Sequence, residues 1–229
     1  MKIGLKIDVD TLRGTREGVP RLLELLEKHG VHATFLFSLG PDQTGRAIRR
    51  VFRKGFVGKV RRTSVVRHYG VRTLLYGTVL PGPDIGRRAM SVLRRVRGEG
   101  HETGIHCWNH VRWQDGVSDA DDDWTRREMQ RACDRYVEVF RESPLTHGAA
   151  GWQMNVHALR LTQQLGFEYC SDGRGTHPHL PRANPWAAAR AGTQRFCRAC
   201  SVDGGPSMRA RPLRALRGIP AGREAFPRW

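Results

Sequence analysis

Short apolar runs alternate with amphipathic stretches along most of the chain. Five apolar runs predict buried strands: Lys2–Val9, Val31–Leu39, Glu102–His106, Thr146–Ala150 and Phe167–Cys170. Apolar residues at helical spacing predict helices in four stretches: Leu22–Leu26 with its flanks, Ile85–Arg97, Trp124–Phe140 and Val156–Leu165. Strands that alternate with helices predict an α/β fold with a parallel sheet, and the one-way repetition favours a barrel-like (β/α) closure. We expect this barrel to be distorted and incomplete, because the alternation stops after Pro181.

Two regions depart from this alternation and define the expected domain organisation. Residues 1–181 form the predicted domain, and residues from about 43 to 83 within it lack any acidic residue, so they read as a basic amphipathic insertion. Residues 182–229 form a basic tail without periodicity. The tail is either a genuine extension or GC-rich DNA read out of frame. We favour the second interpretation, which predicts missing closing strands, uncovered strand edges and marginal stability.

The charge of the chain narrows the classes of partner. The 229 residues carry a formal net charge of +17, with 34 Arg against 5 Lys. A positive field of this size favours phosphate groups or an anionic membrane surface. Nucleic acid is not expected, because the excess of Arg over Lys, with abundant Gly, Ala and Pro, indicates a GC-rich coding background as much as selection for charge. No apolar stretch is long enough to span a bilayer. The five cysteines are scattered and do not predict a disulfide framework. We therefore expect a cytoplasmic protein.

Two carboxylates end the first predicted strand. Asp8 and Asp10 are two residues apart, so in a strand both side chains project to the same face. Active sites in parallel α/β folds lie at this carboxyl end of the strands. The alternative is that the two acids only cap the following helix.

Two histidines follow the third predicted strand. His106 and His110 are four residues apart, and one helical turn would place both imidazoles on the same face. Alone, this spacing is more typical of a surface pair or of partly buried, hydrogen-bonded histidines. Together with Asp10, it supplies the nitrogen and oxygen ligands of a divalent metal of the Zn, Co or Mn type. We assign Asp10, His106 and His110 to the metal and Asp8 to the general base.

Four segments together resemble the polysaccharide deacetylase family, and within it the 4-formamido-arabinose deformylase subgroup. They are residues 6–42, which begin KIDVDTLRGTREG, residues 100–110 (GHETGIHCWNH), 149–152 (AAGW) and 171–175 (SDGRG). The resemblance spans residues 1–181 and implies a barrel-like fold. It also implies removal of a formyl group from an amino sugar on undecaprenyl phosphate, in the modification of lipid A that gives resistance to cationic peptides. Such an enzyme acts on the inner face of the inner membrane.

The resemblance assigns the same roles to Asp8, Asp10, His106 and His110, and two departures qualify it. The broader family has an Arg-x-Pro-x-Gly motif where this chain has Gly148–Trp152, which favours the deformylase subgroup. The family also closes with a strand whose histidine acts as general acid, and nothing in this chain matches it. The alternatives are another carbohydrate N-deacetylase, acting on chitooligosaccharide or peptidoglycan, and an inactive remnant that binds polyprenyl phosphate.

Further candidates for substrate binding are basic or lie near predicted strand ends. Arginines of the insertion suit a phosphate group and an anionic membrane interface. The candidates are Arg49, Arg50, Arg53, Trp152, Asp172 and Arg174.

Overall fold

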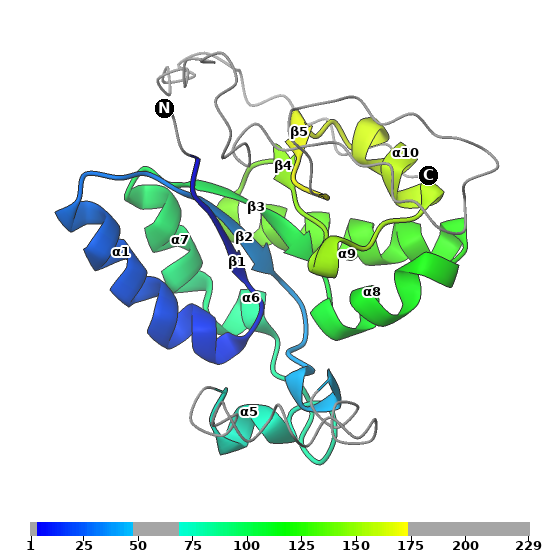
Figure 1. Cartoon of the computed structure of the whole chain (residues 1–229), viewed down its shortest axis with the longest axis horizontal. Coiled ribbons are helices and arrows are strands. Elements are labelled where there is room, and N and C mark those ends of the chain that lie inside the picture. Colours follow the sequence, from blue (N-terminus) through cyan, green and yellow to red (C-terminus); the bar gives the residue numbers. More distant parts are fainter. Residues whose placement is uncertain (1–3, 48–68, 174–229) are drawn as a thin grey trace.

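Five parallel strands follow one another across one sheet in the order of the sequence (Figure 1). The computed structural model describes residues 4–47 and 69–173, and all statements of structure refer to these. The strands are β1 (Lys6–Val9), β2 (Thr34–Ser38), β3 (Glu102–Cys107), β4 (Thr146–His147) and β5 (Tyr169–Cys170). Each pairs in parallel with the next, as the alternation of strands and helices predicts.

The helices that connect the strands stack in the same order as the strands. The α-helices are α1 (Val19–Lys28), α5 (Val71–Leu75), α6 (Ile85–Arg88), α7 (Met90–Gly98), α8 (His110–Gly116), α9 (Asp122–Phe140) and α10 (Val156–Gln164). Single turns precede or follow some of them: η1 (Gly14–Gly18), η2 (Val117–Asp119) and η3 (Ala150–Trp152). Helix α1 contacts α7, α7 contacts α9 and α9 contacts α10, as the wall of a barrel requires. Within the described residues β1 and β5 do not pair, so the predicted α/β architecture, a distorted and incomplete barrel, is confirmed.

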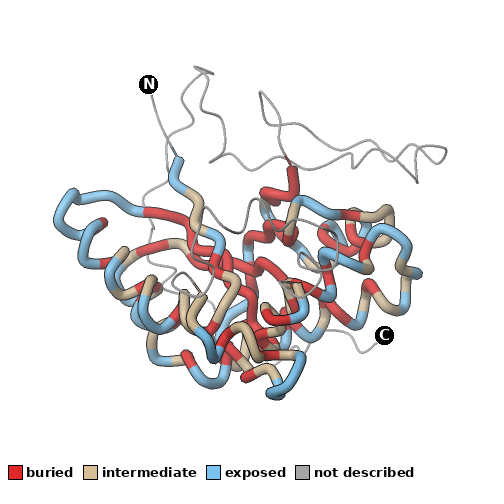
Figure 2. The backbone as a smooth tube through the Cα atoms, turned by 60° about the horizontal axis from the view of Figure 1, so that its bottom comes forward, coloured by how far each residue is buried: buried red, intermediate tan, exposed pale blue. Residues whose placement is uncertain are grey.

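The two faces of the central strands have different neighbours. Phe35, Phe37 and Ile105 belong to the core shared with the helices, and Figure 2 shows this buried layer running through the middle of the molecule. Leu36 lies between the two phenylalanines, so its side chain points to the opposite face. In the sheet, Leu36 stands beside Asp8 on one side and Gly104 on the other. The face opposite the helices is therefore the one that carries Asp8.

The clearest differences from the sequence predictions concern three elements. The helix predicted over Ile85–Arg97 bends at Ala89 (φ −120°, ψ 17°), where the carbonyl of Arg88 accepts hydrogen bonds from the guanidinium of Arg16. Strand β4 has only two residues, because the chain turns into η3 with positive φ at Gly151 and Trp152. Helix α8 was not predicted. It begins at His110, directly after the end of β3.

About half of the insertion and the whole of the tail lie outside the described residues. Helix α5 belongs to the described part of the insertion, whereas residues 48–68 and 174–229 are not described. No helix among the described residues is long and apolar enough to cross a membrane. The division into a domain of residues 1–181 and a tail of residues 182–229 stays a prediction.

Gly104 offers a test of the close packing in the middle of the sheet. A Cβ atom at Gly104 would lie 2.4 Å from Cγ2 of Thr146 and 2.8 Å from Cδ2 of Leu36. We expect G104A to lower the free energy of unfolding by about 1–3 kcal/mol in urea denaturation, the usual cost of overpacking. The control is G98A at the end of α7, where a Cβ would meet nothing within 4 Å and stability should be unchanged or slightly higher. Equal effects of the two variants would contradict this account.

Candidate metal centre

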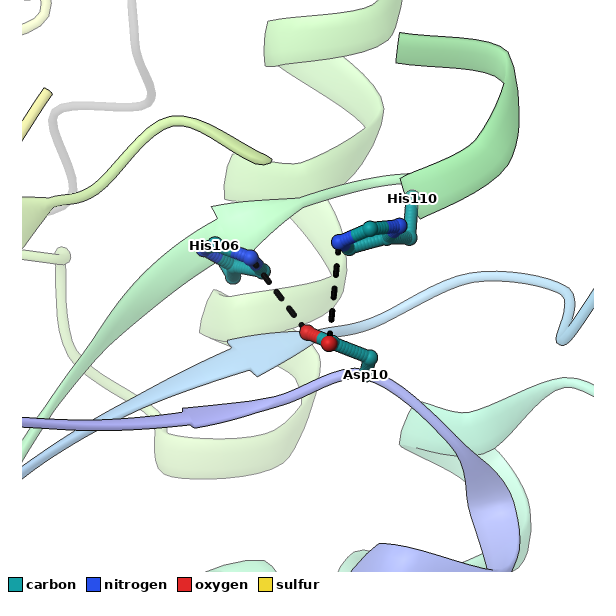
Figure 3. Close-up of side chains that lie close together, drawn as sticks. All are labelled: Asp10, His106 and His110. Carbon is teal, nitrogen blue, oxygen red and sulfur yellow. Dashed lines mark ion pairs between the residues drawn. The ribbon is translucent and has the colours of Figure 1, made fainter. Parts of the chain in front are cut away.

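Asp10, His106 and His110 come together where β1 and β3 end (Figure 3). Oδ1 of Asp10 lies 3.3 Å from Nε2 of His106, and its Oδ2 lies 3.6 Å from Nε2 of His110. The two imidazole rings are 5.3 Å apart between centroids. One carboxylate and two imidazoles thus present their ligand atoms to the same point, with all three within 4.8 Å of one another.

Two different elements supply the histidines. His106 belongs to strand β3, whereas His110 is the first residue of α8. The prediction that both share one helical turn is therefore wrong. They meet because the chain turns sharply after β3, where Oδ1 of the buried Asn109 caps α8 by accepting a hydrogen bond from the backbone N–H of Arg112 (3.0 Å).

The protonation of His106 follows from its surroundings. Its Nδ1 lies 2.5 Å from the carbonyl oxygen of Gly148, which can only accept, so Nδ1 carries the proton. Burial lowers the pKa of His106, against the opposing effect of the carboxylates of Asp10 and Asp8, and this favours the neutral imidazole. Neutral His106 therefore directs the unprotonated Nε2, a potential metal ligand, toward Asp10.

The contacts of Asp10 fit a cation at this point. Among the described residues, none donates a hydrogen bond to its buried Oδ1. Nε2 of His106, 3.3 Å away, is also an acceptor, so the two atoms repel unless a positive charge lies between them. One Asp and two neutral His form a donor set suited to Zn²⁺ or a similar divalent ion. The residues thus fit the predicted metal, whose identity stays open.

Asp8 lies beside this group and has a cationic partner. Its Oδ2 is 3.0 Å from Nζ of Lys6, and its Oδ1 is 4.0 Å from Nδ1 of His106. Only 12% of the Lys6 side chain is exposed, and its ammonium lies 5.8 Å from the centre of the Trp152 ring. Lys6 was not among the site residues predicted from the sequence. The available signal was its position two residues before Asp8, which places both side chains on the same face of the strand.

The remaining predicted site residues fall into three cases. Trp152 is 40% exposed beside Lys6, so its predicted contact with substrate stays a prediction. Asp172 is fully buried and its Oδ1 accepts hydrogen bonds from His147 and from the backbone of Ala149, so the structure does not place it for contact with substrate. Four candidates lie outside the described residues: Arg49, Arg50, Arg53 and Arg174.

Comparison with known proteins places this site in a family. The profile of the family described as polysaccharide deacetylase matches residues 3–170, which include all four acidic and histidine residues of the site. The chain belongs to the polysaccharide deacetylase family. Family membership agrees with the resemblance of the sequence segments that carry Asp8, Asp10, His106 and His110.

Two relatives and one solved structure define the similarity further. The chain is 38% identical over 185 residues to the 4-deoxy-4-formamido-L-arabinose-phosphoundecaprenol deformylase ArnD of Shewanella sediminis, covering 79% of this chain and 59% of the relative. It is 30% identical over 169 residues to the ArnD protein of Wigglesworthia glossinidia brevipalpis, covering 73% and 59%. A polysaccharide deacetylase structure from Mycobacterium smegmatis aligns with a TM-score of 0.49 and 21% identity, covering 73% of this chain and 49% of that one. The chain thus spans about three fifths of the length of these curated relatives.

The contribution of His110 to metal binding can be measured directly. We expect H110A to weaken the binding of Zn²⁺ by more than about 100-fold in calorimetric titration, because the loss of a ligand should exceed the 10- to 100-fold cost of losing a residue that only supports one. The matched control is H157A, since His157 pairs with Asp122 away from this site. Unchanged affinity in H110A would remove His110 from the metal site.

Proposed function

We propose that this chain is a metal-dependent amide hydrolase that removes an acyl group from an amino sugar. The observation that carries the proposal is the position of Asp8, whose carboxylate lies beside the Asp10, His106 and His110 group without being one of its three converging ligands. A base next to a metal site is the arrangement that hydrolysis of an amide requires. Membership in the polysaccharide deacetylase family supports the same reaction class.

The substrate we propose is the 4-formamido-arabinose of an undecaprenyl-phosphate-linked sugar, which would lose its formyl group as formate. Support comes from the two relatives, both named as deformylases of this compound. The reaction would serve the addition of aminoarabinose to lipid A and resistance to cationic peptides. It would take place on the inner face of the inner membrane, with the protein bound peripherally.

The residues of the chain divide the chemistry between them. Asp10, His106 and His110 would hold a divalent ion, which would supply the Lewis acidity needed to polarise the amide carbonyl and to acidify water. Asp8 is the general base that takes the proton of the attacking water. Lys6 holds Oδ2 of Asp8 at 3.0 Å, so Oδ1 is the oxygen left to accept this proton. The ammonium of Lys6 lies 5.8 Å from the centre of the Trp152 ring, which is within the range of a cation–π contact.

The departing amine also needs a proton donor. Among residues 4–47 and 69–173, no third histidine joins Asp10, His106 and His110 within ligand distance. Because acid catalysis contributes about 10²- to 10⁴-fold in rate, we expect slow turnover if no other group supplies this proton.

Release of formate from a formamido-arabinose lipid tests the proposal. We expect formate from the chain loaded with Zn²⁺, Co²⁺ or Mn²⁺, and none after removal of the metal by a chelator. The second candidate is an N-deacetylase of the same family, since the match to the family over residues 3–170 does not distinguish which acyl group is removed. Acetate release from chitooligosaccharide or peptidoglycan fragments would favour this candidate. Metal binding without release of either acid would favour an inactive remnant.

Substitution of Asp8 separates the base from the metal site. We expect D8N to lower the rate of formate release by about 10²- to 10⁴-fold while metal affinity falls much less than in H110A, because Asp8 acts on water. The matched control is D134N. Asp134 lies on α9, and among the described contacts its carboxylate bonds only to Gln130, so this variant should keep full activity. Full activity in D8N would refute the assignment.

Attraction to the membrane is a separate part of the proposal. Three arginines of the insertion, Arg49, Arg50 and Arg53, would contact anionic head groups or the phosphate of the lipid carrier. We expect the triple substitution of these residues by Glu to reduce co-sedimentation with vesicles that contain anionic lipid. The same charge change at the exposed residues Arg21, Arg127 and Arg160 is the control and should have a smaller effect. If the two triple variants lose vesicle binding to the same extent, the binding depends on net charge alone.

A further inference from the structure

A buried hydrogen-bonded pair links the end of β4 to the residues that follow β5. Nδ1 of His147 is 2.7 Å from Oδ1 of Asp172, and the side chains are 3% and 0% exposed. The same oxygen of Asp172 accepts a hydrogen bond from the backbone N–H of Ala149 at 2.9 Å. Asp172 thus holds the residues on both sides of Gly148.

Gly148 connects this pair to the metal site. Its carbonyl accepts the hydrogen bond from Nδ1 of His106 that leaves Nε2 unprotonated. The peptide around it is also fixed by the backbone, since the N–H of Gly148 donates to the carbonyl of Ile105 at 2.9 Å. A Cβ atom at Gly148 would lie 2.3 Å from Cδ1 of Leu36, so the chain approaches β2 as closely as a glycine allows. The direction of the Gly148 carbonyl therefore depends on contacts on three sides.

We propose that Asp172, together with His147, is a positioning residue for the metal ligand His106. Asp172 fixes the backbone from 147 to 149, this backbone aims the Gly148 carbonyl, and the carbonyl holds His106 in the tautomer that can bind a metal. The proposal rests on the metal site of the proposed function. It reassigns Asp172 from substrate binding to the support of His106.

The energetic cost of Asp172 supports a role of this kind. Its Oδ2 is buried and accepts no hydrogen bond among the described residues. A carboxylate in this position is costly to desolvate, and the two hydrogen bonds to Oδ1 only partly offset the cost. Buried groups that fix the orientation of a metal ligand are a general feature of metal sites, where their removal weakens binding by about 10- to 100-fold.

A second metal ion is the main alternative use of these residues. His147, Cys170 and Asp172 bring their ligand atoms within 4.8 Å of one another. However, Nδ1 of His147 and Oδ1 of Asp172 are 2.7 Å apart, the distance of a hydrogen bond, so each already satisfies the other. The geometry favours a hydrogen-bonded pair, and the number of ions bound decides between the two.

The test uses the full chain with three variants. D172A removes both hydrogen bonds to Oδ1. D172N keeps an oxygen that can accept both, so it is the conservative variant. Y136F is the matched control, because it removes a buried hydroxyl that bonds to Thr103 on the same strand as His106. Nitrogen-15 NMR of the imidazoles, without metal, reports the tautomer of His106, and titration with Zn²⁺ reports affinity and stoichiometry.

We expect His106 to carry its proton on Nδ1 in the unaltered chain, in D172N and in Y136F, and to populate both tautomers in D172A. Zn²⁺ affinity should fall about 10- to 100-fold in D172A, and less than 3-fold in the other two. If D172A does not fold, H147L removes one of the two hydrogen bonds and should shift the tautomer and the affinity in the same direction.

Three results would overturn the proposal. They are an unchanged His106 tautomer in the folded D172A or H147L variant, an equal loss of affinity in Y136F, and the binding of a second equivalent of Zn²⁺ that D172A abolishes. Neither measurement uses a substrate, so a chain that releases no formate can still support or refute the role of Asp172. Failure of the proposed reaction and failure of the positioning role are thereby distinguished.

Discussion

Two acceptors face each other at the centre of this site. Oδ1 of Asp10 lies 3.3 Å from Nε2 of His106, and no described residue donates a hydrogen bond to it. In a partly buried place this arrangement is unfavourable without a cation, because the carboxylate charge and the nitrogen lone pair repel each other. The fold holds them together through the sheet, where β2 pairs in parallel with β1 on one side and β3 on the other. The structure thus maintains an arrangement that binding of a divalent ion would stabilise.

The groups around this centre are arranged to preserve its charge pattern. Lys6 compensates Asp8, so the second carboxylate does not compete for the same cation. The Gly148 carbonyl fixes the proton of His106 on the nitrogen that faces away from Asp10. Asn109 caps the helix that begins with His110 and so fixes the position of the third ligand. Each contact uses a different element, which explains why the site depends on the fold as a whole.

An open sheet is sufficient to bring these residues together. The proposed base and two of the ligands come from the ends of β1 and β3, and β4 leads into the Gly148 carbonyl that supports them. The chain covers 59% of the length of its ArnD relatives, and within the described residues β1 and β5 remain at the two edges of the sheet. The described part therefore contains the groups proposed for metal binding and water activation. Among the described residues no group is assigned as the proton donor for the amine, and the arginines proposed to bind phosphate lie outside them.

The order of strands and helices follows from the sequence alone, since the alternation of apolar runs and amphipathic stretches depends only on local periodicity. The sequence also indicated Asp8, Asp10, His106 and His110, because strand ends and ligand spacing are visible along the chain. It did not reveal that His106 and His110 belong to a strand and a helix, because the turn at Asn109 depends on packing after β3. Nor could it reveal the Gly148 carbonyl or the inward role of Asp172. A backbone oxygen has no sequence signature. The contact of Asp172 with His147 joins residues 25 positions apart, and that of the Gly148 carbonyl with His106 joins residues 42 positions apart, so only the tertiary structure decides what each group holds in place.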